Sequence, residues 1–133
     1  QIWIHGDNLI MVPHFCKKSY NEANIGFYFH TPFPSTGIFR VFQFRNDILT
    51  SLLQCDLIGF HLFEYARNFI MTCHRMLGLE YEFSRGGYLS VNNHGKNVMI
   101  RVSNAGIDER YIEDLMKQNG YRRMVKAFKN QIA

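Results

Sequence analysis

Three histidines stand at or just past the ends of short apolar runs that read as strands: His5, His30 and His61. In open α/β sheets, ligands bind beyond the carboxyl ends of the strands, where the loops that lead into helices converge. Imidazole nitrogens can donate to or accept from sugar hydroxyls and phosphate oxygens. A single strand-end histidine is most often structural. Three at one edge of one sheet leave two interpretations open, namely structural hydrogen bonds or a pocket for a polar ligand.

A metal site is the main competing interpretation, because histidine is the commonest metal ligand. No two of these histidines have local ligand spacing, and no cysteine or clustered carboxylate accompanies them, so we predict no metal. The sequence also lacks a P-loop, a nucleophile elbow and a dinucleotide fingerprint. Gly86-Gly87 could hold an anion, but its position between two alternating runs favours a hairpin turn.

The segments around the histidines alternate between strand and helix patterns. Residues 24–30 are aromatic and almost continuously apolar, which is typical of a strand covered on both faces in a parallel sheet. Residues 44–54 form an amphipathic helix pattern, and residues 57–60 a short buried strand. A longer helix is predicted over 62–77, with these side chains facing inward: Phe63, Ala66, Phe69, Ile70, Cys73 and Leu77. This order predicts βαβ units in an α/β fold.

The pattern changes after Gly78. Alternating runs predict strands joined by hairpin turns, with strands at 81–84, 88–91 and 98–102 and turns at 85–87 and 92–97. The tail from Asp108 is predicted to be helical, with a break at Gly120 before a second helix over 121–131.

Composition excludes several classes of function. The chain has 133 residues, of which 47% are hydrophobic and 20% charged, as expected for one soluble globular domain. No apolar run reaches the roughly 18 residues that a membrane span needs. Lysine and arginine are scattered, which disfavours nucleic acid. The net charge of +4 suits either a phosphorylated substrate or an ordinary solvated surface.

The three cysteines lie far apart, at Cys16, Cys55 and Cys73. An odd, unclustered set argues against a disulfide framework and against a zinc site. It favours reduced thiols, and we therefore expect a cytoplasmic protein.

Several long strings carry a specific resemblance. They read FHTPFPS at 29–35, IFR at 38–40, DLIGFH at 56–61, YARNF at 65–69 and RMLGLEYE at 75–82. Together they resemble segments of trehalose-6-phosphate synthases, glycosyltransferase family 20, in the same order and without large gaps. The likeness runs from residue 2 to about residue 110.

This resemblance implies a GT-B fold, in which two Rossmann-like domains face each other across a cleft. Residues 1–133 would be a partial N-terminal domain with both ends missing: a Rossmann-like parallel sheet with a β-hairpin insertion. The family transfers glucose from UDP-glucose to glucose 6-phosphate with retention, without a cofactor. By resemblance, His30 reaches the donor glucose near the reacting centre and is the predicted catalytic residue. His61 belongs to the same cleft floor and is predicted to bind substrate.

One loop departs from the family pattern. The family's His-Asp-Tyr-His is here His5-Gly6-Asp7-Asn8, so the aspartate that contacts the sugar is replaced by glycine. Asp7 is shifted by one residue, and we expect Asp7 and Asn8 to bind substrate in its place. The departure supports an alternative function: a catalytically impaired, synthase-like protein that binds sugar phosphate or regulates a synthase or phosphatase partner. The 133 residues alone lack the family's UDP-gripping domain and are expected to be inactive.

Overall fold

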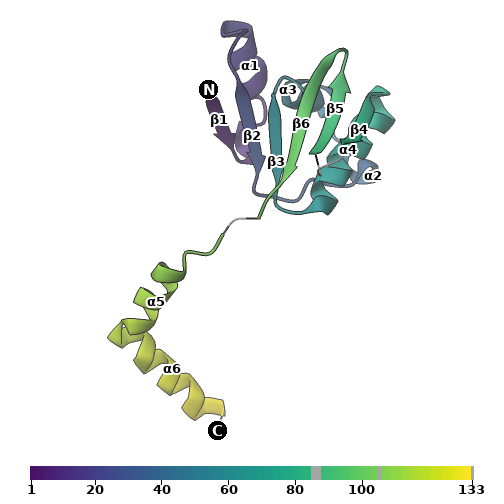
Figure 1. Cartoon of the computed structure of the whole chain (residues 1–133). Helices are drawn as coiled ribbons and strands as arrows, with labels where there is room; N and C mark the ends of the chain where they lie inside the picture. The colour runs from purple at the N-terminus through teal and green to yellow at the C-terminus, as the bar shows by residue number, and fades with distance from the viewer. Residues whose placement is uncertain (85–87, 105, 133) are drawn as a thin grey trace.

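A six-stranded sheet with the strand order β1-β2-β3-β6-β5-β4 organises the chain (Figure 1). The structure, a computed structural model, describes residues 1–84, 88–104 and 106–132. The parallel part consists of β1 (Ile2–His5), β2 (Ile25–Phe29), β3 (Leu57–Phe60) and β6 (Lys96–Val102). The antiparallel part adds β5 (Tyr88–Asn93) and β4 (Glu80–Ser84). The predicted Rossmann-like parallel sheet with a β-hairpin insertion is confirmed.

Two turns in the hairpin region were predicted. The turn at 85–87 lies outside the described residues. The turn predicted at 92–97 is shorter than expected, because pairing continues to Asn93 and resumes at Lys96. His94 and Gly95 close it with φ angles of 51° and 95°, the positive values that a type I′ hairpin turn requires at both central residues.

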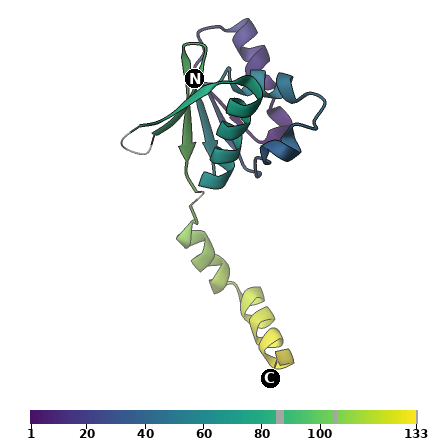
Figure 2. The same cartoon turned by 90° about the vertical axis from the view of Figure 1, so that its right-hand side faces the viewer.

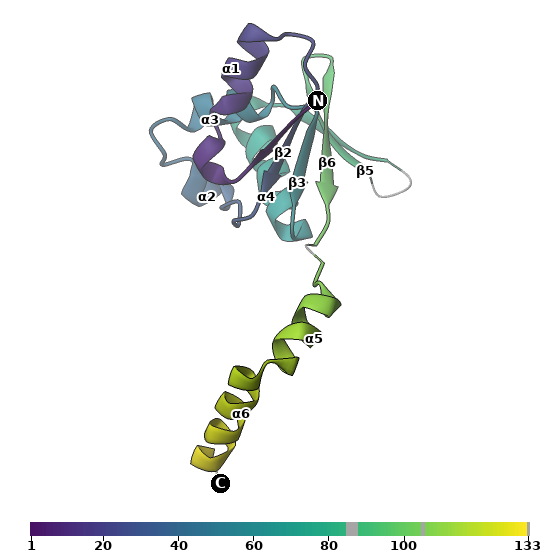
Figure 3. The same cartoon turned by 90° about the vertical axis from the view of Figure 1, so that its left-hand side faces the viewer.

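Helices cover one face of the sheet, as Figures 2 and 3 show from opposite sides. They are η1 (Asp7–Leu9), α1 (Val12–Ser19), α2 (Thr36–Phe39), α3 (Arg45–Leu52) and α4 (Phe63–Leu77). In these views, no helix of the described residues covers the other face, which we call the open face. The strand predicted over 24–30 is β2, and four of its five residues are buried, although helices of the described residues cover only one of its faces. On the open face, the Trp3 ring lies over Gly26 instead.

The core lies between the sheet and these helices. Ala66, Phe69, Ile70 and Cys73 of α4 are buried as predicted. Phe63 was predicted to face inward, but its side chain is 54% exposed. It is the first residue of α4, beyond the carboxyl end of β3, and it lines a hollow on the open face. The helix ends at Gly78, whose φ of 68° is a left-handed conformation that glycine adopts without strain.

The chain continues past β6 into two helices that extend away from the sheet, α5 (Glu109–Lys117) and α6 (Asn119–Ile132) (Figure 1). Asp108 caps α5, since its Oδ1 accepts hydrogen bonds from the backbone amides of Arg110 and Tyr111. The break between the helices falls at Gln118, and Gly120 lies inside α6. The predicted break at Gly120 is therefore wrong by two residues. No helix of the described residues is long and apolar enough to cross a membrane.

Candidate functional site

The three strand-end histidines meet at the carboxyl edge of β1, β2 and β3. Nδ1 of His5 lies 3.0 Å from Nε2 of His30, so one imidazole donates a hydrogen bond to the other. The ring centroids of His30 and His61 lie 5.5 Å apart. His5 and His30 are exposed and His61 is half-buried, so a ligand can approach the cluster. The structure thus brings together the histidines that the sequence places at strand ends.

Strand register explains why the histidines share the open face. Tyr28 of β2 is in register with His5 on one side and with Gly59 on the other. Side chains alternate between the two faces along a strand, so His30 follows Tyr28 on the same face and His61 follows Gly59. Parallel pairing then places all three imidazoles at one edge.

Tyr28 is the centre of this cluster. Its ring centroid lies 6.0 Å from that of His5, 5.0 Å from that of His30 and 5.1 Å from that of His61. Its hydroxyl lies 3.1 Å from Nδ1 of His61 and donates to the backbone carbonyl of Ser103. The sequence analysis missed this residue. A tyrosine two positions before His30, and thus on the same face of the strand, was the available signal.

Glycine at position 59 makes room for the Tyr28 ring. A Cβ added to Gly59 would lie 2.3 Å and 2.8 Å from two carbon atoms of that ring, closer than real Cβ contacts. The ring therefore lies directly on the backbone of β3. Any side chain at this position would displace Tyr28 and, with it, the contacts to the histidines.

The loop after His30 is anchored to the core. Phe33 is 2% exposed and packs edge-on against Phe69 of α4, with ring centroids 5.3 Å apart. Nδ2 of Asn68 donates a hydrogen bond of 3.1 Å to the carbonyl of Phe33. Pro32 and Pro34, which flank Phe33, cannot extend a strand ladder. The loop therefore turns away from the sheet and leaves the imidazole of His30 exposed.

Asp7 and Asn8 begin the 3₁₀ helix that follows β1, and both are exposed. Asp7 lines a hollow beside the loop of residues 31–34, together with Phe39 and Phe42. No hydrogen bond joins Asp7 or Asn8 to a histidine of the cluster among the described residues. Their predicted substrate contacts remain a prediction.

Gly6 has φ 87° and ψ 148°, a backbone conformation that is essentially restricted to glycine. A Cβ there would meet no atom within 4 Å, so the restriction comes from the backbone itself. An aspartate at position 6, as in the family pattern, would therefore require a different turn.

We expect Gly6→Ala to lower the free energy of unfolding of the full-length protein by about 1–3 kcal/mol, the typical cost of a residue held in a sparsely populated backbone region. Urea denaturation measures the change. Gly37→Ala is the matched control, because Gly37 lies in α2 and a Cβ there also meets no atom within 4 Å. Equal effects of the two substitutions would show that the Gly6 turn carries no strain.

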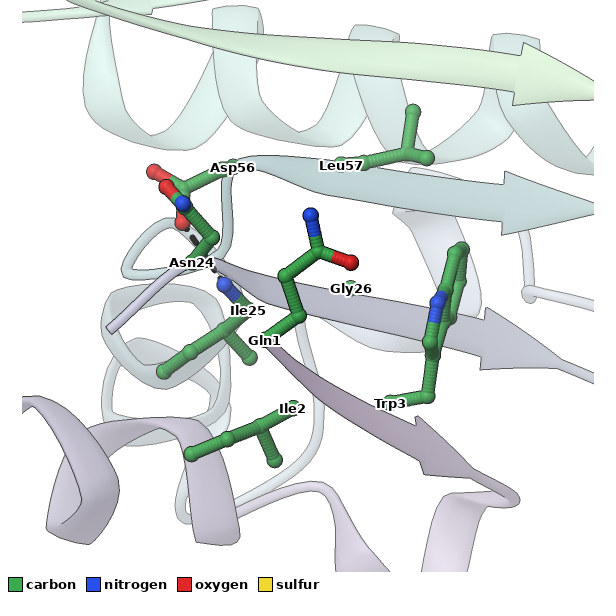
Figure 4. A pocket seen from close by; sticks show the side chains of 8 residues that line it. All are labelled: Gln1, Ile2, Trp3, Asn24, Ile25, Gly26, Asp56 and Leu57. Atoms are coloured by element: carbon green, nitrogen blue, oxygen red, sulfur yellow. Dashed lines mark hydrogen bonds between the residues drawn. The ribbon is translucent and has the colours of Figure 1, made fainter.

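A third hollow lies at the amino edge of the sheet, opposite the histidine cluster (Figure 4). There the Asp56 carboxylate accepts a hydrogen bond of 2.8 Å from the backbone amide of Ile25 and lies 3.0 Å from the Lys96 ammonium. Partial burial by itself would raise the pKa of Asp56, but the Ile25 amide, the Lys96 ammonium and the nearby Lys17 ammonium together outweigh it and hold the pKa below its usual value. The residues that line this hollow include none of the three histidines, so it is separate from the candidate site.

Two of the three cysteines, Cys55 and Cys73, are buried in the core. Burial raises the pKa of the Cys55 thiol and of the Cys73 thiol to about 12, so both are protonated and unreactive near neutral pH. All three cysteines are free. Within residues 1–84, 88–104 and 106–132, no group of three or more His, Cys, Asp or Glu side chains could hold a metal ion.

Comparisons with known proteins identify the family and the fold. A family-wide sequence profile described as glycosyltransferase family 20 matches residues 1–133. The chain is 44% identical, over 86% of its length, to a probable alpha,alpha-trehalose-phosphate synthase (UDP-forming) of Arabidopsis thaliana. Among solved structures, the N-terminal domain of Candida albicans trehalose-6-phosphate phosphatase matches 97% of the chain with a TM-score of 0.83 and 33% identity. An E. coli structure bound with UDP-2-fluoro glucose matches 95% of it with a TM-score of 0.77 and 26% identity.

The match covers a small part of each relative. The chain spans 13% of the length of the Arabidopsis protein. It spans 27% of the Candida structure and 28% of the E. coli structure.

Proposed function

Because the chain belongs to glycosyltransferase family 20, we propose that the full-length protein transfers glucose from UDP-glucose to glucose 6-phosphate with retention and forms trehalose 6-phosphate. The full-length protein has two Rossmann-like domains, and residues 1–133 form part of the N-terminal domain. The observation that carries the proposal is the cluster of His5, His30 and His61 on the carboxyl edge of a parallel sheet. Two of these histidines belong to the strings that resemble the family.

The descriptions of two relatives support UDP-glucose as the donor. The Arabidopsis relative is described as UDP-forming, and the E. coli structure holds UDP-2-fluoro glucose. In the proposed reaction, His30 hydrogen-bonds the donor glucose, and His61 forms part of the cleft floor. Pre-positioned hydrogen bonds of this kind stabilise the charge that develops on the sugar as the bond to UDP breaks.

The hydrogen bond to His5 determines which nitrogen of His30 is available to the donor sugar. Nε2 of His30 is already hydrogen-bonded to His5, which leaves Nδ1 of His30 for the sugar. The imidazole of His5 thereby orients His30, in the way that a second group orients many catalytic histidines. Asp7 and Asn8 bind substrate from the neighbouring turn.

The alternative, a regulatory protein that binds sugar phosphate without reacting, rests on Gly6, which replaces the family's aspartate. The name of the Arabidopsis relative supports a synthase rather than this alternative. The three free cysteines agree with a reducing, cytosolic setting.

We expect the purified full-length protein to form trehalose 6-phosphate and UDP in equal amounts from UDP-glucose and glucose 6-phosphate. Chromatography coupled to mass spectrometry measures both products. Reactions without donor and without acceptor are the controls. Binding of UDP-glucose without any trehalose 6-phosphate would contradict the proposal and support the regulatory alternative.

A further inference from the structure

The contacts of Tyr28 define which nitrogen of His61 carries a proton. The Tyr28 hydroxyl has one hydrogen, which it donates to the Ser103 carbonyl. Its oxygen can therefore only accept a hydrogen bond from Nδ1 of His61, which lies 3.1 Å away. In the neutral imidazole, Nδ1 then carries the hydrogen and Nε2 carries the lone pair.

The Ser103 carbonyl fixes the direction of the hydrogen bond from the Tyr28 hydroxyl. A carbonyl oxygen can only accept, and its residue is held in place because the Ser103 amide donates to the Phe60 carbonyl at 2.9 Å, extending the ladder between β3 and β6. If the Tyr28 hydroxyl turned toward His61, two oxygen acceptors would face each other without a hydrogen between them. The arrangement Tyr28-to-Ser103 and His61-to-Tyr28 is the one that satisfies all three groups.

The tyrosine ring is itself positioned. It lies against the bare backbone of Gly59 and beside the rings of both His30 and His61, with centroid distances of 5.0 Å and 5.1 Å. Among the described residues, Nε2 of His61 has no hydrogen-bond partner. Every buried side-chain nitrogen or oxygen of these residues does have a hydrogen-bond partner, so Nε2 is not buried. Nε2 therefore reaches solvent at the carboxyl edge of the sheet.

We propose that Tyr28 is a positioning residue of the sugar site, which holds His61 as the Nδ1-protonated tautomer so that Nε2 accepts a hydrogen bond from a sugar hydroxyl. The inference rests on the proposed function, because a sugar hydroxyl is the donor that it requires. Without Tyr28, neutral His61 can adopt either tautomer. The tautomer with hydrogen on Nε2 cannot accept from a hydroxyl, and part of the protein is then unable to make the contact.

The test compares wild type and Tyr28→Phe in the full-length protein labelled with ¹⁵N-histidine, using long-range ¹H–¹⁵N spectra assigned with a His61→Gln variant. In wild type, Nδ1 of His61 should carry the hydrogen. In Tyr28→Phe, the two nitrogens should shift toward a mixture of tautomers. An unchanged His61 tautomer in Tyr28→Phe would overturn the proposal. This spectrum needs no catalysis, so it separates failure of this inference from failure of the proposed function.

Kinetics give the second readout. Tyr28→Phe should lower kcat/KM for UDP-glucose about 3- to 10-fold, the effect expected from one lost hydrogen bond. In the His61→Gln background, the same change should lower it less than about twofold, because Tyr28 acts through His61. Tyr20→Phe is the matched control, since Tyr20 is 69% exposed at the end of α1. Equal losses in both backgrounds would overturn the positioning role.

Discussion

Replacing His30 by alanine in the full-length protein should slow glucose transfer about a hundred- to a thousandfold. This is the range observed when one pre-positioned hydrogen bond to a developing charge is removed, about 2.7–4 kcal/mol of transition-state stabilisation. His30 is exposed at the carboxyl edge of β2 and is oriented by the hydrogen bond of its Nε2 to His5. Its truncation leaves the core packing unchanged, so the loss should appear in kcat rather than in stability.

Steady-state kinetics with UDP-glucose and glucose 6-phosphate measure the effect, and thermal unfolding checks that the fold is retained. His14→Ala is the matched control, because His14 is an exposed histidine of α1 whose ring lies beside Phe15 and outside the cluster. A decrease in kcat of less than about tenfold for His30→Ala would contradict the donor-sugar role. His5→Ala should give a smaller decrease than His30→Ala, because it removes only the partner that orients His30.

Replacing Phe60 by alanine should lower the free energy of unfolding by about 3–5 kcal/mol, the usual cost of truncating a buried phenylalanine. Phe60 is fully buried and precedes His61 directly. Its ring stacks on that of Phe29, the residue before His30, with centroids 5.2 Å apart and an interplanar angle of 2°. Its ring centroid also lies 5.7 Å from that of Phe69 of α4. The same core therefore supports both histidine-bearing strand ends.

Urea denaturation of the full-length protein measures this change. Phe15→Ala is the control, because Phe15 is 60% exposed on α1 and its truncation should alter stability by no more than about 0.5 kcal/mol. Phe60→Ala should also reduce activity, but through a smaller folded fraction, so its activity should recover on cooling toward the temperature of maximum stability. Comparable destabilisation by the two substitutions would show that the aromatic core is not what holds the site.

Local patterns predicted most of the elements. The helix over 62–77 and the strand over 57–60 were correct because a long amphipathic period and a short apolar run are local signals. The errors occur where tertiary context decides. Phe63 lies at a position that the helical periodicity places on the inward face. It is nevertheless exposed, because it is the first residue of α4 and lies beyond the ends of the strands. Gly120 is a plausible helix breaker, but the helices part at Gln118, and a glycine inside a helix is tolerated.

The sequence by itself determined the family, the α/β class and the placement of three histidines at strand ends. The family motifs and the strand periodicity each depend only on residues that are close together in the sequence. Only the tertiary structure decided that His5 pairs with His30 and that Tyr28 bridges His61 to Ser103. These contacts join residues that are 25, 33 and 75 positions apart. They depend on the register between strands, and a shift by one residue would move every side chain to the opposite face.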